Sequence, residues 1–72
     1  MFSREEFGKR VKEARQKSGE TQTDLGLYLG VKKSQVSELE NGNTSTTVEK
    51  VAMICEHYKI SADYLLGLKD EP

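Results

Sequence analysis

Residues 21–42 read TQTDLGLYLGVKKSQVSELENG, and this stretch decides the fold. Thr21 followed three residues later by Asp24 is a signature of a helix N-terminus, in which each side chain satisfies a backbone N–H group of the other residue. Apolar residues then recur at helical spacing until Gly30, the residue type favoured at the left-handed position that ends a helix. The pattern predicts a helix of barely two turns between Thr21 and Gly30.

A second short helix follows almost at once. Val36 and Leu39 form the inward face of residues 32–40, and the turn dipeptide Asn41-Gly42 ends the segment. A connection this short makes the two helices cross at a steep angle, as in a helix-turn-helix. Gly26 carries no side chain, so it lets the second helix approach the first closely.

The start of this second helix has two alternatives. Lys32 stands at the N-cap position, where its side chain cannot accept the capping hydrogen bond. The helix therefore either runs from Lys32 to Glu40 or begins later, with Ser34 as its cap. The choice affects which side chains reach outward from the helix.

Helical patterns also flank this stretch on both sides. Ser3 and Glu6 form a capping box ahead of an amphipathic helix, which Ser18-Gly19 terminates. Thr47 caps a fourth helix with the longest apolar face, and Ser61 caps a short fifth helix. Because no alternation of polar and apolar residues of useful length is present, the predicted fold class is all-α.

The composition restricts the class of protein. With 72 residues, of which 35% are hydrophobic and 32% charged, the chain has room for one core. We expect one domain over residues 1–68 and a frayed acidic tail over residues 69–72. The longest aliphatic stretch, residues 51–55, is far shorter than the roughly 20 residues of a membrane span, and the N-terminus lacks the apolar segment of a signal peptide. We expect a cytoplasmic protein with no membrane partner.

Neither a metal site nor a catalytic site is indicated. Cys55 is the single cysteine, and with His57 alone beside it a structural zinc site cannot be completed. The two residues are two positions apart on one helix, so their side chains point about 200° apart and form no dyad. We expect Cys55 in the core and His57 on the surface, and we predict no enzyme activity, no cofactor, no metal and no small-molecule ligand.

The charges are distributed unevenly along the chain. The formal net charge is −1, but residues 1–36 hold eight basic and five acidic side chains, whereas residues 37–72 hold three basic and seven acidic ones. The distribution over faces matters more for binding than the total. This asymmetry is consistent with a polar partner that is met at one end of the molecule.

Several separate segments resemble the Cro and phage-repressor (XRE-type) helix-turn-helix family, in the right order and spacing. The matching segments are residues 21–26, 29–31, 36–42 and 60–67, which together extend over nearly the whole chain. The resemblance implies a compact five-helix, lambda-repressor-like domain with a helix-turn-helix in its second and third helices. It also implies a transcription regulator, in the usual case a repressor, that binds a pseudo-palindromic operator in double-stranded DNA as a homodimer.

The resemblance assigns DNA base contacts to the N-terminal part of the third helix, which family members place in the major groove. Helical geometry by itself puts Ser34 and Glu38 on the side opposite the inward face. A lysine suits guanine O6 and N7, and a glutamate can accept a hydrogen bond from cytosine N4. An ordinary solvated face is the alternative interpretation. The residues assigned to base contacts are Lys32, Lys33, Ser34, Ser37 and Glu38.

Phosphate contacts are expected on either side of that helix. Gln22 opens the second helix, where free N–H groups and the positive end of the helix dipole favour an anion. The alternative roles are a polar first-turn residue for Gln22 and a simple turn for Asn41. The residues assigned to phosphate contacts are Gln22, Asn41, Asn43 and Thr44.

The resemblance also implies two structural roles. Arg15 and Glu40 match the positions of a partly buried ion pair that ties the first helix to the end of the third. A homodimer would use the fifth helix and the loop before it, although closure of the core accounts equally well for the same side chains. The candidates for this contact are Tyr58, Tyr64, Leu65 and Leu68.

A second function remains open on the same fold. In this alternative the chain is an antitoxin-like module that binds another protein through its acidic half and binds DNA only weakly. The slight excess of acidic residues supports it. Salt dependence separates the two functions, because binding to phosphates weakens steeply with salt and an apolar protein interface barely responds.

Overall fold

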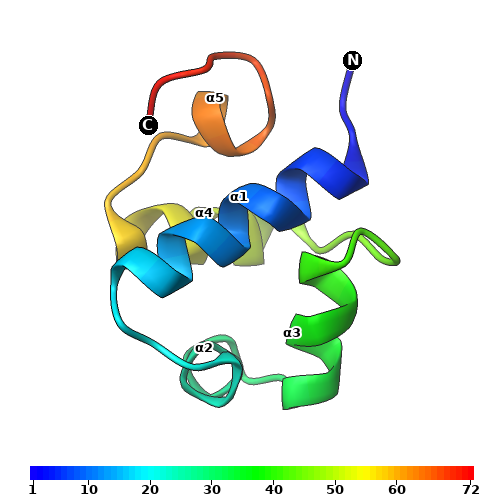
Figure 1. Ribbon diagram of the computed structural model, residues 1–72, viewed down its shortest axis with the longest axis vertical. Helices are drawn as coiled ribbons and strands as arrows, with labels where there is room; N and C mark the ends of the chain where they lie inside the picture. Colours follow the sequence, from blue (N-terminus) through cyan, green and yellow to red (C-terminus); the bar gives the residue numbers. More distant parts are fainter.

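The computed structural model describes all 72 residues, and they form five helices and no strand. The helices are α1 (Arg4–Lys17), α2 (Gln22–Leu29), α3 (Lys33–Glu40), α4 (Val48–Tyr58) and α5 (Ala62–Leu65). The predicted all-α fold class is therefore confirmed. Helix α1 runs through the middle of the molecule, with α2 and α3 at one end and α5 at the other (Figure 1).

Polar side chains cap four of the five helices at their N-termini. Ser3 Oγ accepts a hydrogen bond from the Glu6 backbone at 3.1 Å, and Thr21 and Asp24 form the predicted reciprocal capping box. The Thr47 and Ser61 side chains each accept a hydrogen bond from the backbone N–H three residues later, at the start of α4 and of α5. These caps satisfy N–H groups that have no partner inside the helix, which fixes where each helix begins.

Helix α3 begins at Lys33, so the alternative of a late start with Ser34 as cap is wrong. The Lys32 side chain makes no capping bond, as its chemistry requires. Instead, the Gln35 side chain reaches back and accepts a hydrogen bond from the Lys32 backbone N–H at 2.8 Å. One half of a capping box is therefore sufficient here, and α3 keeps its full two turns.

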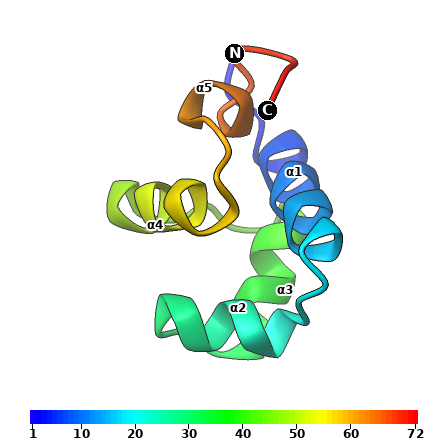
Figure 2. The same cartoon turned by 90° about the vertical axis from the view of Figure 1, so that its left-hand side faces the viewer.

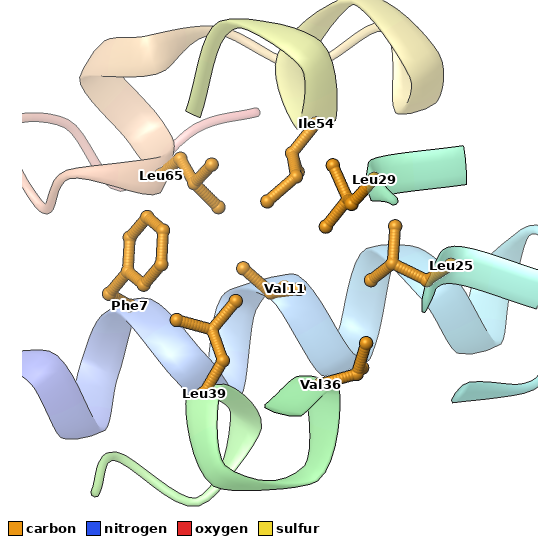
Figure 3. Close-up of a cluster of buried hydrophobic side chains, with 8 residues drawn as sticks. All are labelled: Phe7, Val11, Leu25, Leu29, Val36, Leu39, Ile54 and Leu65. Carbon is orange, nitrogen blue, oxygen red and sulfur yellow. The ribbon is translucent and has the colours of Figure 1, made fainter. Parts of the chain in front are cut away.

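The hydrophobic core collects side chains from every helix. Their burial stabilises the fold by about 1.5–3 kcal/mol for each large side chain. The side chains converge on the space between α1 and the other four helices (Figure 3). The eight buried residues are Phe7, Val11, Leu25, Leu29, Val36, Leu39, Ile54 and Leu65.

Two glycines allow the helices to pack closely. A Cβ atom on Gly26 would lie 2.8 Å from the Val31 carbonyl oxygen, so Gly26 lets α2 contact the turn that leads into α3. A Cβ atom on Gly8 would overlap the carbonyl groups of Leu39 and Glu40. The sequence analysis identified the first of these contacts and missed the second, which brings the end of α3 against α1.

The acidic tail makes polar contacts with the rest of the domain. Arg10 Nη1 donates a hydrogen bond to the Lys69 carbonyl at 2.8 Å, and Arg10 Nη2 lies 3.5 Å from the Asp70 carboxylate. The Ser61 backbone N–H donates to the Pro72 carbonyl at 3.0 Å. These contacts hold the tail at the end of the molecule opposite α2 and α3, and the two chain ends marked in two perpendicular views both lie toward that end (Figures 1 and 2). None of the helices has the length and apolar character that crossing a membrane requires.

Candidate nucleic-acid interface

The residues assigned to DNA contacts lie on the first turn of α2, on α3 with the N-cap residue before it, and on the loop after α3. Ser37 and Gln22 are half-buried. The remaining members of the set are exposed, and they are Lys32, Lys33, Ser34, Glu38, Asn41, Asn43 and Thr44. The fold thus leaves lysine, hydroxyl, amide and carboxylate groups of these segments accessible to solvent.

A groove of about 480 Å³ runs between α3 and the loop that follows it. Ser34 and Glu38 line the α3 side, and hydroxyl groups of the loop and the Lys50 side chain line the other. Val36 and Leu39 lie at its floor. The outer side of α3 therefore borders a groove that is lined with hydrogen-bonding groups.

Arg15 and Glu40 form a buried, bidentate ion pair between α1 and the last residue of α3. Arg15 Nε lies 2.7 Å from Glu40 Oε2, and Arg15 Nη2 lies 3.0 Å from Glu40 Oε1. The two residues are 7% and 6% exposed. The hydrogen bond to Glu40 raises the pKa of Arg15 above its ordinary value, against the opposing effect of burial. Such a pair fixes the orientation of α3 more than it adds net stability.

The same carboxylate also holds Gln22, the first residue of α2. Gln22 Nε2 donates to Glu40 Oε1 at 3.1 Å. Because an ionised carboxylate can only accept hydrogen bonds, it fixes which end of the Gln22 amide points toward Glu40. One N–H of the amide is used internally, and the second is left to donate outward.

A further cluster around Glu20 escaped the sequence analysis. Glu20 lies between α1 and α2, and its carboxylate contacts His57 Nε2 and the Tyr58 hydroxyl, each at 2.8 Å. His57 is half-buried rather than a surface residue. Burial and the contact with Glu20 raise the pKa of Tyr58 well above its ordinary range. No local pattern signals this cluster, because Glu20 lies more than 35 residues before His57 and Tyr58 and only packing of α4 brings them together.

The four candidates for a dimer contact have different surroundings. Leu65 is fully buried in the core, and Tyr64 is 9% exposed beneath the guanidinium of Arg10. Tyr58 is half-buried against Glu20, whereas Leu68 is 70% exposed. Core packing therefore occupies the side chains of Leu65 and Tyr64, and Leu68 is the most accessible of the four.

The chain is similar to known regulators over most of its length. The HTH-type transcriptional regulator ImmR of Bacillus subtilis (strain 168) is 39% identical over 65 residues, which are 90% of this chain and 50% of ImmR. The antitoxin PezA of Streptococcus pneumoniae serotype 4 is 28% identical over 61 residues, which are 85% of this chain and 39% of PezA. The chain thus spans half or less of the length of these curated relatives.

The fold is similar to that of a solved repressor. The P22 c2 repressor, crystallised in complex with a synthetic operator, matches with a TM-score of 0.77 at 30% identity, over 83% of this chain and 91% of the repressor chain. The helix-turn-helix family model matches residues 11–65. The family consists of transcription regulators rather than enzymes, which agrees with the sequence analysis. The predicted resemblance is confirmed, and the chain belongs to the helix-turn-helix family.

Proposed function

We propose that the protein is a sequence-specific DNA-binding transcription regulator that inserts α3 into the major groove. The observation that carries this proposal is the outer side of α3, where the side chains of Lys33, Ser34 and Glu38 are exposed. Gln22 and Asn41 add polar groups at the start of α2 and the end of α3. The similarity to the P22 c2 repressor, which was crystallised with a synthetic operator, supports it. The domain comprises residues 1–68, and residues 69–72 form its acidic tail.

Each group on this surface has a role that suits its chemistry. Lys33 donates to guanine O6 and N7, Glu38 accepts from cytosine N4, and Ser34 hydrogen-bonds to either kind of base edge. Lys32 and Ser37 lie beside them as further base contacts. Neutral donors bind phosphate oxygens on both sides of the DNA major groove, and these contacts fix the register of the protein on the duplex. These donors are Gln22, Asn41, Asn43 and Thr44.

We further propose that the protein acts as a homodimeric repressor in the cytoplasm. A two-fold symmetric dimer would read a pseudo-palindromic operator, with half-sites one helical turn apart. Among the candidates for the dimer contact, Leu68 is exposed and Tyr58 is half-buried, so these two side chains are the most available to a second copy. In this arrangement a repressor acts by occupying its operator.

The second candidate is an antitoxin-like module that binds another protein. It is favoured by the 28% identity to the antitoxin PezA and by the seven acidic residues of the C-terminal half. A basic partner would bind that acidic half, and DNA binding would be secondary. The two candidates differ in which surface is used, because five of these seven acidic residues lie on α4, α5 or the tail rather than on α3. The five are Glu49, Glu56, Asp63, Asp70 and Glu71.

The first experiment is selection of binding sites from a random duplex pool at near-physiological salt. Enrichment of an inverted repeat with half-sites about 10 bp apart would establish a dimeric operator binder. The enriched bases would then test Lys33 and Glu38 directly. A folded protein that enriches no sequence would favour the protein-binding module.

A matched pair of lysine variants tests the orientation on DNA. Lys33→Ala should weaken binding and change the preferred base at one position of each half-site. Lys12→Ala, which removes an equally exposed lysine from α1, should leave the preferred bases unchanged. If both variants select the same operator as the parent protein, α3 does not read bases through Lys33.

A further inference from the structure

We propose that Glu20 is a positioning residue, which holds the first turn of α2 for phosphate binding and responds to the protonation of His57. The inference rests on the proposed DNA-binding function and adds a pH-dependent control to it. Glu20 lies in the connection between α1 and α2, two residues before Gln22. It makes no direct contact with the proposed base-reading residues, so its effect must pass through its neighbours.

The Glu20 carboxylate is fixed by two groups of α4. Oε2 lies 2.8 Å from His57 Nε2, and Oε1 accepts a hydrogen bond from the Tyr58 hydroxyl at 2.8 Å. The side chains of Glu20 and His57 are only 25% and 27% exposed, so solvent screens this contact incompletely. The connection before α2 is therefore tied to the C-terminal end of α4.

The His57 ring is itself held from the side of α2. It stacks on the Tyr28 ring with the centroids 4.0 Å apart and the planes 19° from parallel. The Tyr28 hydroxyl donates to the Met53 carbonyl of α4 at 3.2 Å. The imidazole thus touches both the connection before α2 and the last turn of α2, and its position is determined by both.

The main chain of Glu20 continues the path to Gln22. The Glu20 carbonyl accepts a hydrogen bond from Arg15 Nη1 at 2.8 Å. The other guanidinium nitrogens of Arg15 bind Glu40, and Glu40 binds the Gln22 amide. A shift of Glu20 would move the backbone just before α2 and disturb the arrangement that orients the Gln22 amide.

Protonation of His57 strengthens the contact between the same two atoms, His57 Nε2 and Glu20 Oε2. An ionised Glu20 only accepts hydrogen bonds, so His57 Nε2 carries a hydrogen in both charge states. Protonation turns a neutral hydrogen bond into an ion pair. The groups that face the ring are Glu20 from the connection, Tyr28 from α2 and Tyr58 from α4, and the Arg15 cation lies on the far side of Glu20.

A Glu20→Gln variant reverses this response. The amide Oε1 can still accept from Tyr58, which leaves the NH₂ group facing His57. A neutral imidazole can accept that N–H bond through the other tautomer, whereas a protonated imidazole presents a second donor and repels it. Acidification should therefore tighten the contact in the parent protein and break it in the variant.

The experiment measures binding to a random-sequence duplex at constant salt, at about pH 7 and about pH 5.5, the interval in which imidazole is the side chain that normally changes charge. His57 is the single histidine of the chain, which makes the assignment direct. We expect acidification to raise the affinity of the parent protein about threefold, the size that partly exposed ion pairs support. We expect it to lower the affinity of Glu20→Gln.

The opposite signs separate positioning from a simple charge effect. If protonated His57 only attracted DNA as an extra positive charge, both proteins would bind more tightly in acid, and the proposal would be overturned. His57→Gln should show a much smaller change over this interval, because it removes the only imidazole of the chain. Circular dichroism at each pH ensures that only folded protein is compared.

A readout without DNA keeps this inference distinct from the proposed function. The NMR signals of the Gln22 side-chain amide should shift with pH in the parent protein and remain constant in His57→Gln. If the protein binds no duplex but the Gln22 signals follow His57, the DNA-binding proposal fails and the coupling stands. If the protein binds the duplex but the Gln22 signals respond to pH in the same way in the parent protein and in His57→Gln, the proposed coupling is wrong.

Discussion

Gln22 Nε2 lies 3.1 Å from Glu40 Oε1, so the first residue of α2 is joined to the last residue of α3. Arg15 of α1 binds the same carboxylate. One buried carboxylate therefore fixes the relative orientation of the three helices whose ends meet there. The geometry of the proposed DNA surface depends on this group as much as on the hydrophobic core.

Arg15→Ala should lower the free energy of unfolding by about 3 kcal/mol, because it leaves the Glu40 carboxylate buried without its partner. DNA binding should weaken as well, since Glu40 orients Gln22. Urea denaturation of the two single variants and of Arg15→Ala/Glu40→Ala measures the coupling. If the double variant loses as much unfolding free energy as the two single variants lose together, the pair does not act as a unit.

Gly8→Ala should destabilise the protein, although glycine to alanine in a helix normally stabilises by about 1 kcal/mol. The added Cβ would collide with the carbonyl groups of Leu39 and Glu40, which are backbone atoms that cannot turn aside. We expect a loss of about 1–3 kcal/mol, the usual cost of overpacking. Lys9→Ala, at the exposed neighbouring position, is the control and should change the unfolding free energy little. A stabilised Gly8→Ala protein would contradict the close contact of α1 and α3.

Lys59 ends α4 with φ 56°, the only residue other than glycine with a positive φ angle. A side chain in this conformation costs about 1 kcal/mol relative to glycine. Lys59→Gly should therefore stabilise the protein by up to about that amount. Lys12→Gly, in the middle of α1, should destabilise it by about the same amount. Thermal unfolding measures both changes in stability. If Lys59 does not adopt the left-handed conformation, both variants should be less stable than the parent protein.

Asp24 gives the unfolding free energy a dependence on acid pH. Hydrogen bonds from the Thr21 backbone and side chain lower the pKa of its carboxyl. A group whose pKa is lower in the folded state stabilises the protein above its unfolded pKa, and this contribution is lost as pH falls through the folded-state value. Denaturation curves between about pH 5 and pH 2 should show less loss for Asp24→Asn than for the parent protein. If the unfolding free energy of the two proteins falls equally with pH, the capping box does not favour the ionised form of Asp24.

Glu38→Gln should bind non-specific duplex DNA roughly threefold more tightly, because it removes a negative charge from the surface proposed to face phosphate. Glu56→Gln removes an exposed charge from α4 and is the matched control. Fluorescence anisotropy at several salt concentrations compares the two. Glu38 would not face DNA if its variant bound no better than the parent protein while Glu56→Gln gained affinity.

The local signals in the sequence predicted the helices well. Capping residues such as Thr21 and Ser61 act on N–H groups within three residues, so their effect can be read from adjacent positions. Gly30 adopts the predicted left-handed conformation, with φ 75°. The start of α3 was the ambiguous case, because the Gln35 side chain satisfies the Lys32 backbone in place of a capping residue.

Contacts between distant segments were predicted only where a family resemblance supplied them. The Arg15 and Glu40 positions came from that resemblance, and the structure pairs them at 2.7 Å. Nothing in the sequence indicated that Gly8 meets the end of α3 or that His57 meets Glu20. Such contacts depend on how the helices pack, and a single sequence carries no periodic signal for them.

The Arg10 contacts that hold the acidic tail have a practical consequence for handling the protein. They keep the C-terminal tail at the end remote from α3, and the Ser61 bond to the Pro72 carbonyl uses an oxygen that persists when the chain is extended (Figure 2). A dye or affinity handle attached at the C-terminus would therefore stand clear of the α3 surface. Immobilised or labelled protein should expose that surface to a duplex in solution.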